Sequence, residues 1–118
     1  RIVGSNLPTA NYASIARLLV DVYERAKRRK GDIVARCAFV HSRFEQIHPF
    51  SDGNGRVGRL LMTAMLLKSN VAPAIILQEQ KRHYYSYLNK AQVTEDHSQL
   101  EDFICDAVFK GYEILARL

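Results

Sequence analysis

Apolar residues recur at helical spacing through two long segments in the first half of the chain. The first segment is predicted to run from an N-cap at Thr9 to about Arg29, where Gly31 ends it, and its apolar positions are Ile15, Leu18, Leu19, Val22 and Tyr23. The second is predicted to run from a cap at Asp32 to about Ile47, with an apolar stripe of Ile33, Cys37, Val40, Phe44 and Ile47. Because Pro49 cannot continue that helix, a loop is expected to follow it.

The second half of the chain contains three further helical segments. The first, residues 54–69, is dense in Leu, Met and Ala and apolar nearly all round its second half, so we expect it to be the central, buried helix. A turn at 70–73 and a brief extended segment at 74–77 lead to a helix at about 80–93. Ser98 and Glu101 form a capping-box pattern for a last helix that reaches about Leu115.

Residues 1–8 differ from the rest because they are extended and rich in turn residues, which is typical of part of a hairpin. We find no linker, internal repeat or low-complexity tract. The sequence therefore predicts one domain over residues 1–118, an all-α helical bundle around a central buried helix with a short β-hairpin remnant at residues 1–8. Since the chain opens on Arg1, we expect it to be a fragment of a longer protein.

The composition is ordinary for a soluble globular domain, with 47% hydrophobic and 25% charged residues in a chain of 118. No apolar run approaches the ~20 residues of a membrane span and no signal-peptide pattern opens the chain, so we expect no membrane partner. Cys37 and Cys105 lie far apart on apolar helical stripes. Free thiols in a reducing, cytoplasmic compartment are therefore expected, and a metal site or a disulfide is not.

The net charge of +5 is unevenly distributed: residues 1–59 carry 11 Lys and Arg against 5 Asp and Glu, and residues 60–118 carry 6 against 7. Arg25 and the run at 27–30 would suit a nucleic-acid backbone. The run also lies at the end of a predicted helix, where cations complement the helix dipole. We favour that second interpretation and do not expect nucleic acid as a partner.

Residues 53–58 satisfy the dinucleotide-binding pattern G-x-G-x-x-G. That fingerprint requires a strand that ends at its first glycine, because strand end and helix start together place the pyrophosphate. A long helical pattern precedes Gly53 here, and one four-residue extended run cannot supply a parallel sheet. The dinucleotide interpretation is rejected, and Gly58 is assigned to helix packing.

The same loop still has the features of an anion site. Backbone N–H groups of Gly53, Asn54 and Gly55 can form a nest at a helix N-terminus, which carries partial positive charge. Arg56 and Arg59 share one face of the first turns beside that nest, which favours a polyphosphate. The alternative is that both arginines pair with carboxylates on neighbouring helices.

Two residues just before the nest extend this pattern towards catalysis. A carboxylate beside a phosphate site is repulsive unless a cation lies between them, so Asp52 suggests bridging Mg²⁺, although Asp is also common as a turn residue. His48 can accept a proton from a hydroxyl nucleophile near neutral pH, although a lone loop His is more often a hydrogen-bonding residue. Four such requirements within twelve residues favour the catalytic interpretation.

Residues 48–59, HPFSDGNGRVGR, resemble the signature of Fic-domain proteins, H-P-F-x-[D/E]-G-N-G-R-x-x-R, at every fixed position. The resemblance extends over nearly the whole chain, including the helix before the signature, the Leu- and Met-rich helix after it and a Tyr84-Tyr85 pair. It implies an all-α Fic core that transfers AMP from ATP to a Ser, Thr or Tyr hydroxyl of a target protein. Other Fic-type transfers (phosphorylation, removal of AMP) and a non-enzymatic nucleotide-binding regulator are the alternatives.

The resemblance also implies roles for individual residues. His48 resembles the base that deprotonates the target hydroxyl, and Asp52 resembles the ligand of a Mg²⁺ that bridges the α- and β-phosphates. Phe50 would anchor the loop in the core. The implied nucleotide-binding residues are Gly53, Asn54 and Gly55 as the anion hole, Arg56 and Arg59 on the phosphates, and Tyr84, Tyr85 and Gln92 at the base and ribose. For the two tyrosines, core packing at helical spacing is an equal alternative.

Residues outside the signature bear on target binding and regulation. Val3, Gly4, Ser5 and Asn6 resemble the end of the family's flap, a hairpin that holds the target by strand addition, and its first strand is missing from this chain. Many relatives are inhibited by a helix with [S/T]-x-x-x-E-[G/N], and no such motif is present here. Three alternatives stay open: an inhibitory segment before Arg1, an antitoxin-like partner protein that carries the inhibitory helix, or no inhibitor at all. His41 is expected to pack or to support the site from behind.

Overall fold

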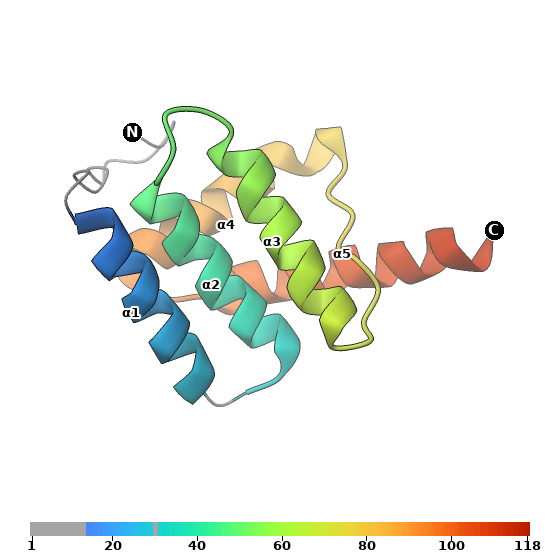
Figure 1. Ribbon diagram of the computed structural model, residues 1–118. Helices are drawn as coiled ribbons and strands as arrows, with labels where there is room; N and C mark the ends of the chain where they lie inside the picture. Colours follow the sequence, from blue (N-terminus) through green and yellow to red (C-terminus); the bar gives the residue numbers. More distant parts are fainter. Residues whose placement is uncertain (1–13, 30) are drawn as a thin grey trace.

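The computed structural model describes residues 14–29 and 31–118, and in this part of the chain all regular structure is helical (Figure 1). The helices are α1 (Ile15–Arg28), α2 (Ile33–Ile47), α3 (Asn54–Lys68), α4 (Lys81–Thr94) and α5 (Ser98–Ala116), with a 3₁₀ turn, η2 (Gln78–Gln80), before α4. The all-α prediction is confirmed for these residues. The predicted cap at Thr9 and the hairpin remnant at 1–8 lie outside them.

Helix α2 occupies the centre of the bundle. Within the described residues its backbone runs close to those of α1, α3, α4 and α5, whereas the backbone of α3 comes close to that of α2 alone. Figure 1 shows α1, α2 and α3 side by side, with α4 and α5 behind them. The expectation that residues 54–69 form the central helix is therefore wrong, and Leu60 of α3 is 69% exposed. Only the face of α3 with Gly58, Met62 and Leu66 is buried, because an all-round apolar pattern does not determine how many neighbours a helix has.

The interior consists of two apolar clusters that α2 joins. The larger one brings together α2, α3, α4 and α5 and contains Cys37, Ala38, Met62, Leu66, Tyr84, Leu88, Ala91, Leu100, Ile104 and Val108. The smaller one lies between α1 and α2 and contains Val22, Phe39, Val40 and Ile47. Cys37 and Cys105 are free, as predicted, and burial raises the pKa of the Cys37 thiol to about 11, so this thiol stays protonated.

The helix starts show one correct and one wrong cap prediction. The Asp32 side chain accepts a hydrogen bond of 2.9 Å from the Ala35 N–H, as predicted. Ser98 and Glu101 do not form the predicted capping box, because Ser98 is already inside α5. Its N–H donates to Asp96 Oδ1 (3.0 Å) and its hydroxyl donates to the same oxygen (2.6 Å). The Ser98 hydroxyl bond, followed by the N–H bond, lowers the pKa of the Asp96 carboxyl.

The basic run lies at the end of α1, as expected from the sequence, with Arg25, Lys27 and Arg28 in its last turn. The guanidiniums of Arg25, Arg29 and Arg43 lie over the ring of buried Phe39, at 5.1, 4.7 and 5.8 Å from its centroid. Part of the positive charge therefore covers an aromatic ring.

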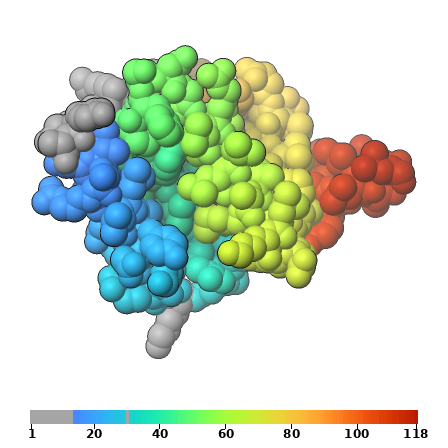
Figure 2. Space-filling view, in the orientation of Figure 1, coloured from blue at the N-terminus to red at the C-terminus, as the bar shows by residue number. Residues whose placement is uncertain are grey.

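Helix α5 combines a close contact with a projecting end. Its last turns extend beyond the body of the molecule, where Tyr112 and Leu115 are exposed (Figures 1 and 2). Closer to the body, the Ala107 carbonyl accepts a bond of 3.0 Å from the Ile75 N–H, so the extended segment at 71–77 is held against α5. No described helix is long and apolar enough to cross a membrane.

Gly111 of α5 is predicted to be intolerant of a larger side chain. A Cβ at this position would lie 2.1 Å from the backbone oxygen of Pro73, which cannot yield cheaply. We expect Gly111→Ala to lower the free energy of unfolding by about 2 kcal/mol, because overpacking against a backbone atom costs about 3 kcal/mol, the upper end of the usual range, and better helix propensity returns about 1. Urea denaturation measures the change, with Asp106→Ala on the exposed face of α5 as control. Equal stabilities of Gly111→Ala and wild type would contradict this packing.

Candidate functional site

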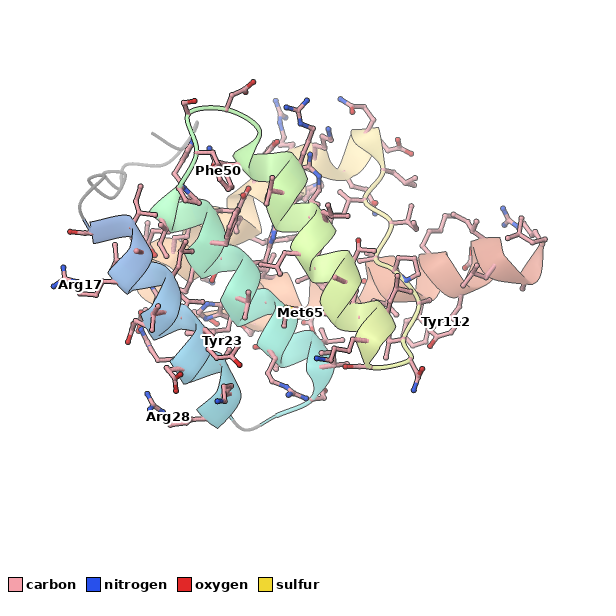
Figure 3. All side chains as sticks on the ribbon, viewed as in Figure 1. Arg17, Tyr23, Arg28, Phe50, Met65 and Tyr112 are labelled. Atoms are coloured by element: carbon pink, nitrogen blue, oxygen red, sulfur yellow. The ribbon has the colours of Figure 1, made fainter. Side chains whose placement is uncertain are left out.

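The loop from His48 to Gly53 joins α2 to α3 at one end of the bundle, and Phe50 within it lies far from Arg28 at the other end (Figure 3). Left-handed backbone conformations bound the loop on both sides, with φ at 53° for His48 and 81° for Gly53. Glycine adopts such a φ without strain, whereas His48 does not. A positive φ at a residue other than glycine makes His48 a candidate functional residue.

The Asn54 side chain fixes the shape of this loop. Its amide accepts a bond of 2.9 Å from the Phe50 N–H and donates one of 2.7 Å to the Phe50 carbonyl. Asn54 is 6% exposed, so water does not compete strongly for these bonds. Phe50 itself is 50% exposed, and its ring centroid lies 6.4 Å from that of Phe44. The expectation that its ring anchors the loop in the core is wrong, because the backbone of Phe50 carries that role.

The start of α3 presents unpaired donors, as the nest hypothesis requires. Within the described residues, no acceptor is found for the backbone N–H groups of Gly53, Asn54, Gly55 and Arg56. The first N–H groups of a helix point along its axis and attract anions. The two glycines also admit the arginines: a Cβ on Gly53 or Gly55 would lie 3.1 Å from a guanidinium nitrogen of Arg56 or Arg59, respectively. Both guanidiniums thus lie beside the helix start.

Asp52 and Arg56 contact each other at the mouth of this loop. Their carboxylate oxygen and guanidinium nitrogen are 3.9 Å apart, and both side chains are largely exposed. Such a pair contributes little to stability, so neither side chain is held away from a ligand. The sequence alternative, in which the arginines pair with acids on neighbouring helices, does not apply to Arg56.

The imidazole of His48 is in a state suited to accept a proton. Burial lowers its pKa below the usual 6.5, so the ring is neutral at neutral pH. Its Nδ1 atom is buried without a hydrogen-bond partner among the residues that the structure describes, which leaves Nε2 as the accessible nitrogen. A neutral imidazole with one accessible nitrogen can act as a general base.

A buried polar cluster lies under the loop and comes from three helices. His41 and Glu45 of α2 are 1% and 7% exposed, and the Tyr84 hydroxyl of α4 shares a hydrogen bond with His41 Nε2. Burial lowers the pKa of His41 to about 4 and raises the pKa of Tyr84, so both are neutral. Arg59 of α3 is close enough to act electrostatically on all three. His41 thus packs in the interior, which is one of its two expected placements.

Glu45 is the residue that sequence reasoning missed. Burial raises the pKa of its carboxyl from 4.5 to about 7, and nearby Arg59 opposes that rise. An acid on a helix face that is otherwise apolar, three residues before His48, was the available signal.

The other predicted nucleotide-binding residues, Tyr84, Tyr85 and Gln92, differ in how exposed their side chains are. Tyr85 is about half exposed, whereas Tyr84 is 1% exposed. Gln92 is also buried and donates a bond of 3.2 Å to the Ser42 carbonyl, so it joins α4 to α2. Nucleotide binding by these three residues stays a prediction, and the structure gives open surface to Tyr85 alone. The predicted flap residues Val3, Gly4, Ser5 and Asn6 lie outside the described residues.

The stability of the protein is predicted to depend on pH through Glu45. Because its folded pKa is raised, the folded state keeps a proton that the unfolded chain releases, and the free energy of unfolding falls as pH rises from 4.5 to about 7. Glu45→Gln has no such proton. We expect its stability relative to wild type to rise by on the order of 3 kcal/mol across this window. Urea unfolding of both proteins at each end of the window tests this, and a constant difference would contradict it.

Comparison with known proteins decides the family. The family model described as "Fic/DOC family" matches residues 4–66, more than half of the chain and all of the loop described above. The chain belongs to the Fic/DOC family. This membership confirms the resemblance seen in residues 48–59.

Individual Fic relatives agree with this assignment. The chain is 43% identical over 67 residues to a protein adenylyltransferase Fic of Nematostella vectensis, which covers 57% of this chain and 15% of the relative. It is 46% identical over 54 residues to the protein of the same name in Aedes aegypti, covering 46% of this chain and 11% of the relative. The chain thus matches only a small part of the length of these curated relatives.

A solved structure supports the fold. A Fic domain containing signaling protein from Bacteroides thetaiotaomicron superposes with a TM-score of 0.78 at 24% sequence identity. The match covers 89% of this chain and 46% of that protein. At this level of identity the likeness establishes the Fic fold.

Proposed function

We propose that this domain transfers AMP from ATP to a Ser, Thr or Tyr hydroxyl of a target protein. The observation that carries the proposal is the convergence on one loop of a neutral His48, the free N–H groups at the start of α3, and two arginines. Phosphoryl-type transfer depends mainly on positioning and on neutralising charge around an in-line attack, and these groups supply both. The adenylyltransferase names of the similar proteins support the same reaction.

Each part of the loop has a role in this proposal. His48 Nε2 takes the proton from the attacking hydroxyl, and the N–H groups of residues 53–56 hold the phosphate oxygens together with Arg56 and Arg59. Tyr85 would contact the base or ribose. The free N–H groups orient the phosphates before the hydroxyl arrives, so little reorganisation is needed during the transfer.

The chain also fits a divalent cation beside the phosphates. Mg²⁺ is usually bound through one or two carboxylates together with substrate phosphates, and Asp52 offers one exposed carboxylate next to the free N–H groups. The described residues contain no group of three or more His, Cys, Asp or Glu side chains that could hold a metal without a substrate. Asp52 would hold the ion, and the ion would neutralise phosphate charge.

The deciding experiment incubates the protein with a cell lysate, Mg²⁺ and ATP labelled at either the α- or the γ-phosphate. AMP transfer places the α-label on protein and adds a nucleotide to the intact mass of the modified target. Transfer of the γ-label with a phosphate mass would support the phosphorylating alternative. ATP binding by calorimetry without transfer of either label would support a nucleotide-binding regulator and overturn the proposal.

A further inference from the structure

Glu45 is a buried carboxyl group placed directly beneath the first turns of α3. Its Oε1 atom is buried, and the described residues offer it no hydrogen-bond partner. Space for this oxygen exists because residue 58 is glycine: a Cβ there would lie 2.7 Å from Glu45 Oε1. A buried, unpartnered carboxyl oxygen is costly, which calls for an explanation beyond packing.

The charges that face Glu45 are few. On its own helix the neighbour is neutral His41, on α4 it is the neutral Tyr84 hydroxyl, and on α3 it is Arg59. Among the described residues Glu45 forms no ion pair, so Arg59 acts on it only through space, and the Arg59 guanidinium lies along α3 against Gly55. The cluster therefore holds one acid and one permanent cation, so the ionisation of Glu45 sets its net charge.

We propose that Glu45 is a positioning residue for Arg59. The Glu45 carboxylate balances the charge of the Arg59 guanidinium from the interior side, and it takes up a proton when a phosphate binds to Arg59. This proposal rests on the proposed function, since it takes Arg59 as a phosphate-binding residue. An anionic phosphate on Arg59 removes the charge compensation that an ionised Glu45 needs. The carboxyl then binds a proton from solvent, and the cluster stays close to neutral.

The physical basis is reciprocal linkage. The carboxyl has a pKa of about 7 in the free protein, so it is only partly ionised at neutral pH and responds to small changes in the field around it. If phosphate binding favours the protonated form, protonation must strengthen phosphate binding by the same free energy. Phosphate affinity therefore rises as pH falls through the Glu45 titration.

The test measures the protons taken up when ATP binds, by calorimetry in buffers of equal pH and different ionisation enthalpy. Wild type at the Glu45 pKa is expected to take up roughly half a proton more than Glu45→Gln, because about half of its Glu45 is ionised there. The difference between the two proteins cancels protons exchanged by ATP itself. Above that pH, wild-type affinity is expected to weaken by up to about tenfold per pH unit relative to the variant.

Two further variants keep the result interpretable. Arg59→Gln removes the cation, so it is expected to bind ATP weakly and without the additional proton, even if Glu45→Gln does not fold. His83→Gln, on the exposed side of α4, is the matched control and is expected to behave as wild type. Equal proton uptake in wild type and Glu45→Gln overturns the proposal.

Calorimetry of ATP binding, together with the label-transfer experiment described above, distinguishes this proposal from the proposed function. Proton-linked binding of ATP without transfer of label overturns the function and supports the linkage. Transfer of AMP without the additional proton overturns the linkage and supports the function. Failure of wild type to bind ATP overturns both.

Discussion

Replacing His48 by alanine is expected to lower the rate of AMP transfer by at least about a hundredfold, the usual contribution of a positioned general base. His48 is the neutral imidazole at the start of the loop, with Nε2 as its accessible nitrogen. Without it, the attacking hydroxyl must lose its proton to water. The phosphate-binding N–H groups and arginines remain, so ATP affinity is expected to change by less than about threefold. A large loss of rate with nearly unchanged affinity would assign His48 to the chemical step and not to binding. Rates come from transfer of α-labelled AMP, and affinities from calorimetry.

A glycine at the same position separates catalysis from folding. His48 has a φ of 53°, which glycine adopts freely, so His48→Gly is expected to be more stable than His48→Ala by about 1 kcal/mol. Both variants lack the imidazole and are expected to be equally inactive. Label transfer by either one at the wild-type rate would remove His48 from the mechanism. His83→Ala on α4 controls for the general effect of losing a histidine, because its side chain is exposed.

Helix positions could be predicted from sequence because they depend on neighbours along the chain. The Asp32 cap follows from one side chain and one N–H three residues away, and the structure has that bond. The Ser98 cap failed for a local reason as well. Asp96, two residues earlier, accepts from both the N–H and the hydroxyl of Ser98, a local alternative that the Ser98 and Glu101 pattern does not reveal.

The sequence could not show which residues of different helices contact one another. The apolar positions of α3 could equally have faced one neighbour or several, and only the packed bundle places α2 at the centre. Tyr84 illustrates the same limit at the site. Its spacing allowed either core packing or a nucleotide pocket, and its bond to His41, 43 positions earlier, places its ring in the interior. Glu45 escaped notice because its role depends on Gly58 and Arg59 of a different helix.

The sequence showed which residue types make up the signature, but not which atoms of each residue hold the loop in shape. Phe50 looked like the anchor of the loop because it is large and apolar, yet its ring is half exposed. Asn54 was assigned to the anion hole, and its side chain is occupied instead with the backbone of Phe50. Its N–H remains available to an anion, so the residue has two roles on two different atoms.

Replacing Asn54 by alanine is therefore expected to be the second most damaging change at the site. Both bonds to Phe50 are lost, which lowers the free energy of unfolding by about 2 kcal/mol at roughly 1 kcal/mol for each bond. The loop that carries His48 and Asp52 then loses its fixed shape. Because a displacement of about 1 Å can cost about a hundredfold in rate, we expect AMP transfer to fall by that order even where the variant is folded.

Two matched variants show whether the clamp itself is responsible. Asn54→Asp keeps the acceptor for the Phe50 N–H and replaces the donor to the Phe50 carbonyl by a carboxylate oxygen that repels it, so it is expected to be no more stable than Asn54→Ala. Asn89→Ala makes the same truncation on α4, where the side-chain oxygen has no partner among the described residues, and is expected to keep wild-type transfer. If folded Asn54→Ala transferred AMP as fast as Asn89→Ala, the loop would hold its catalytic shape without the clamp. The strain at His48 would then have to be balanced by contacts other than the two Phe50 bonds.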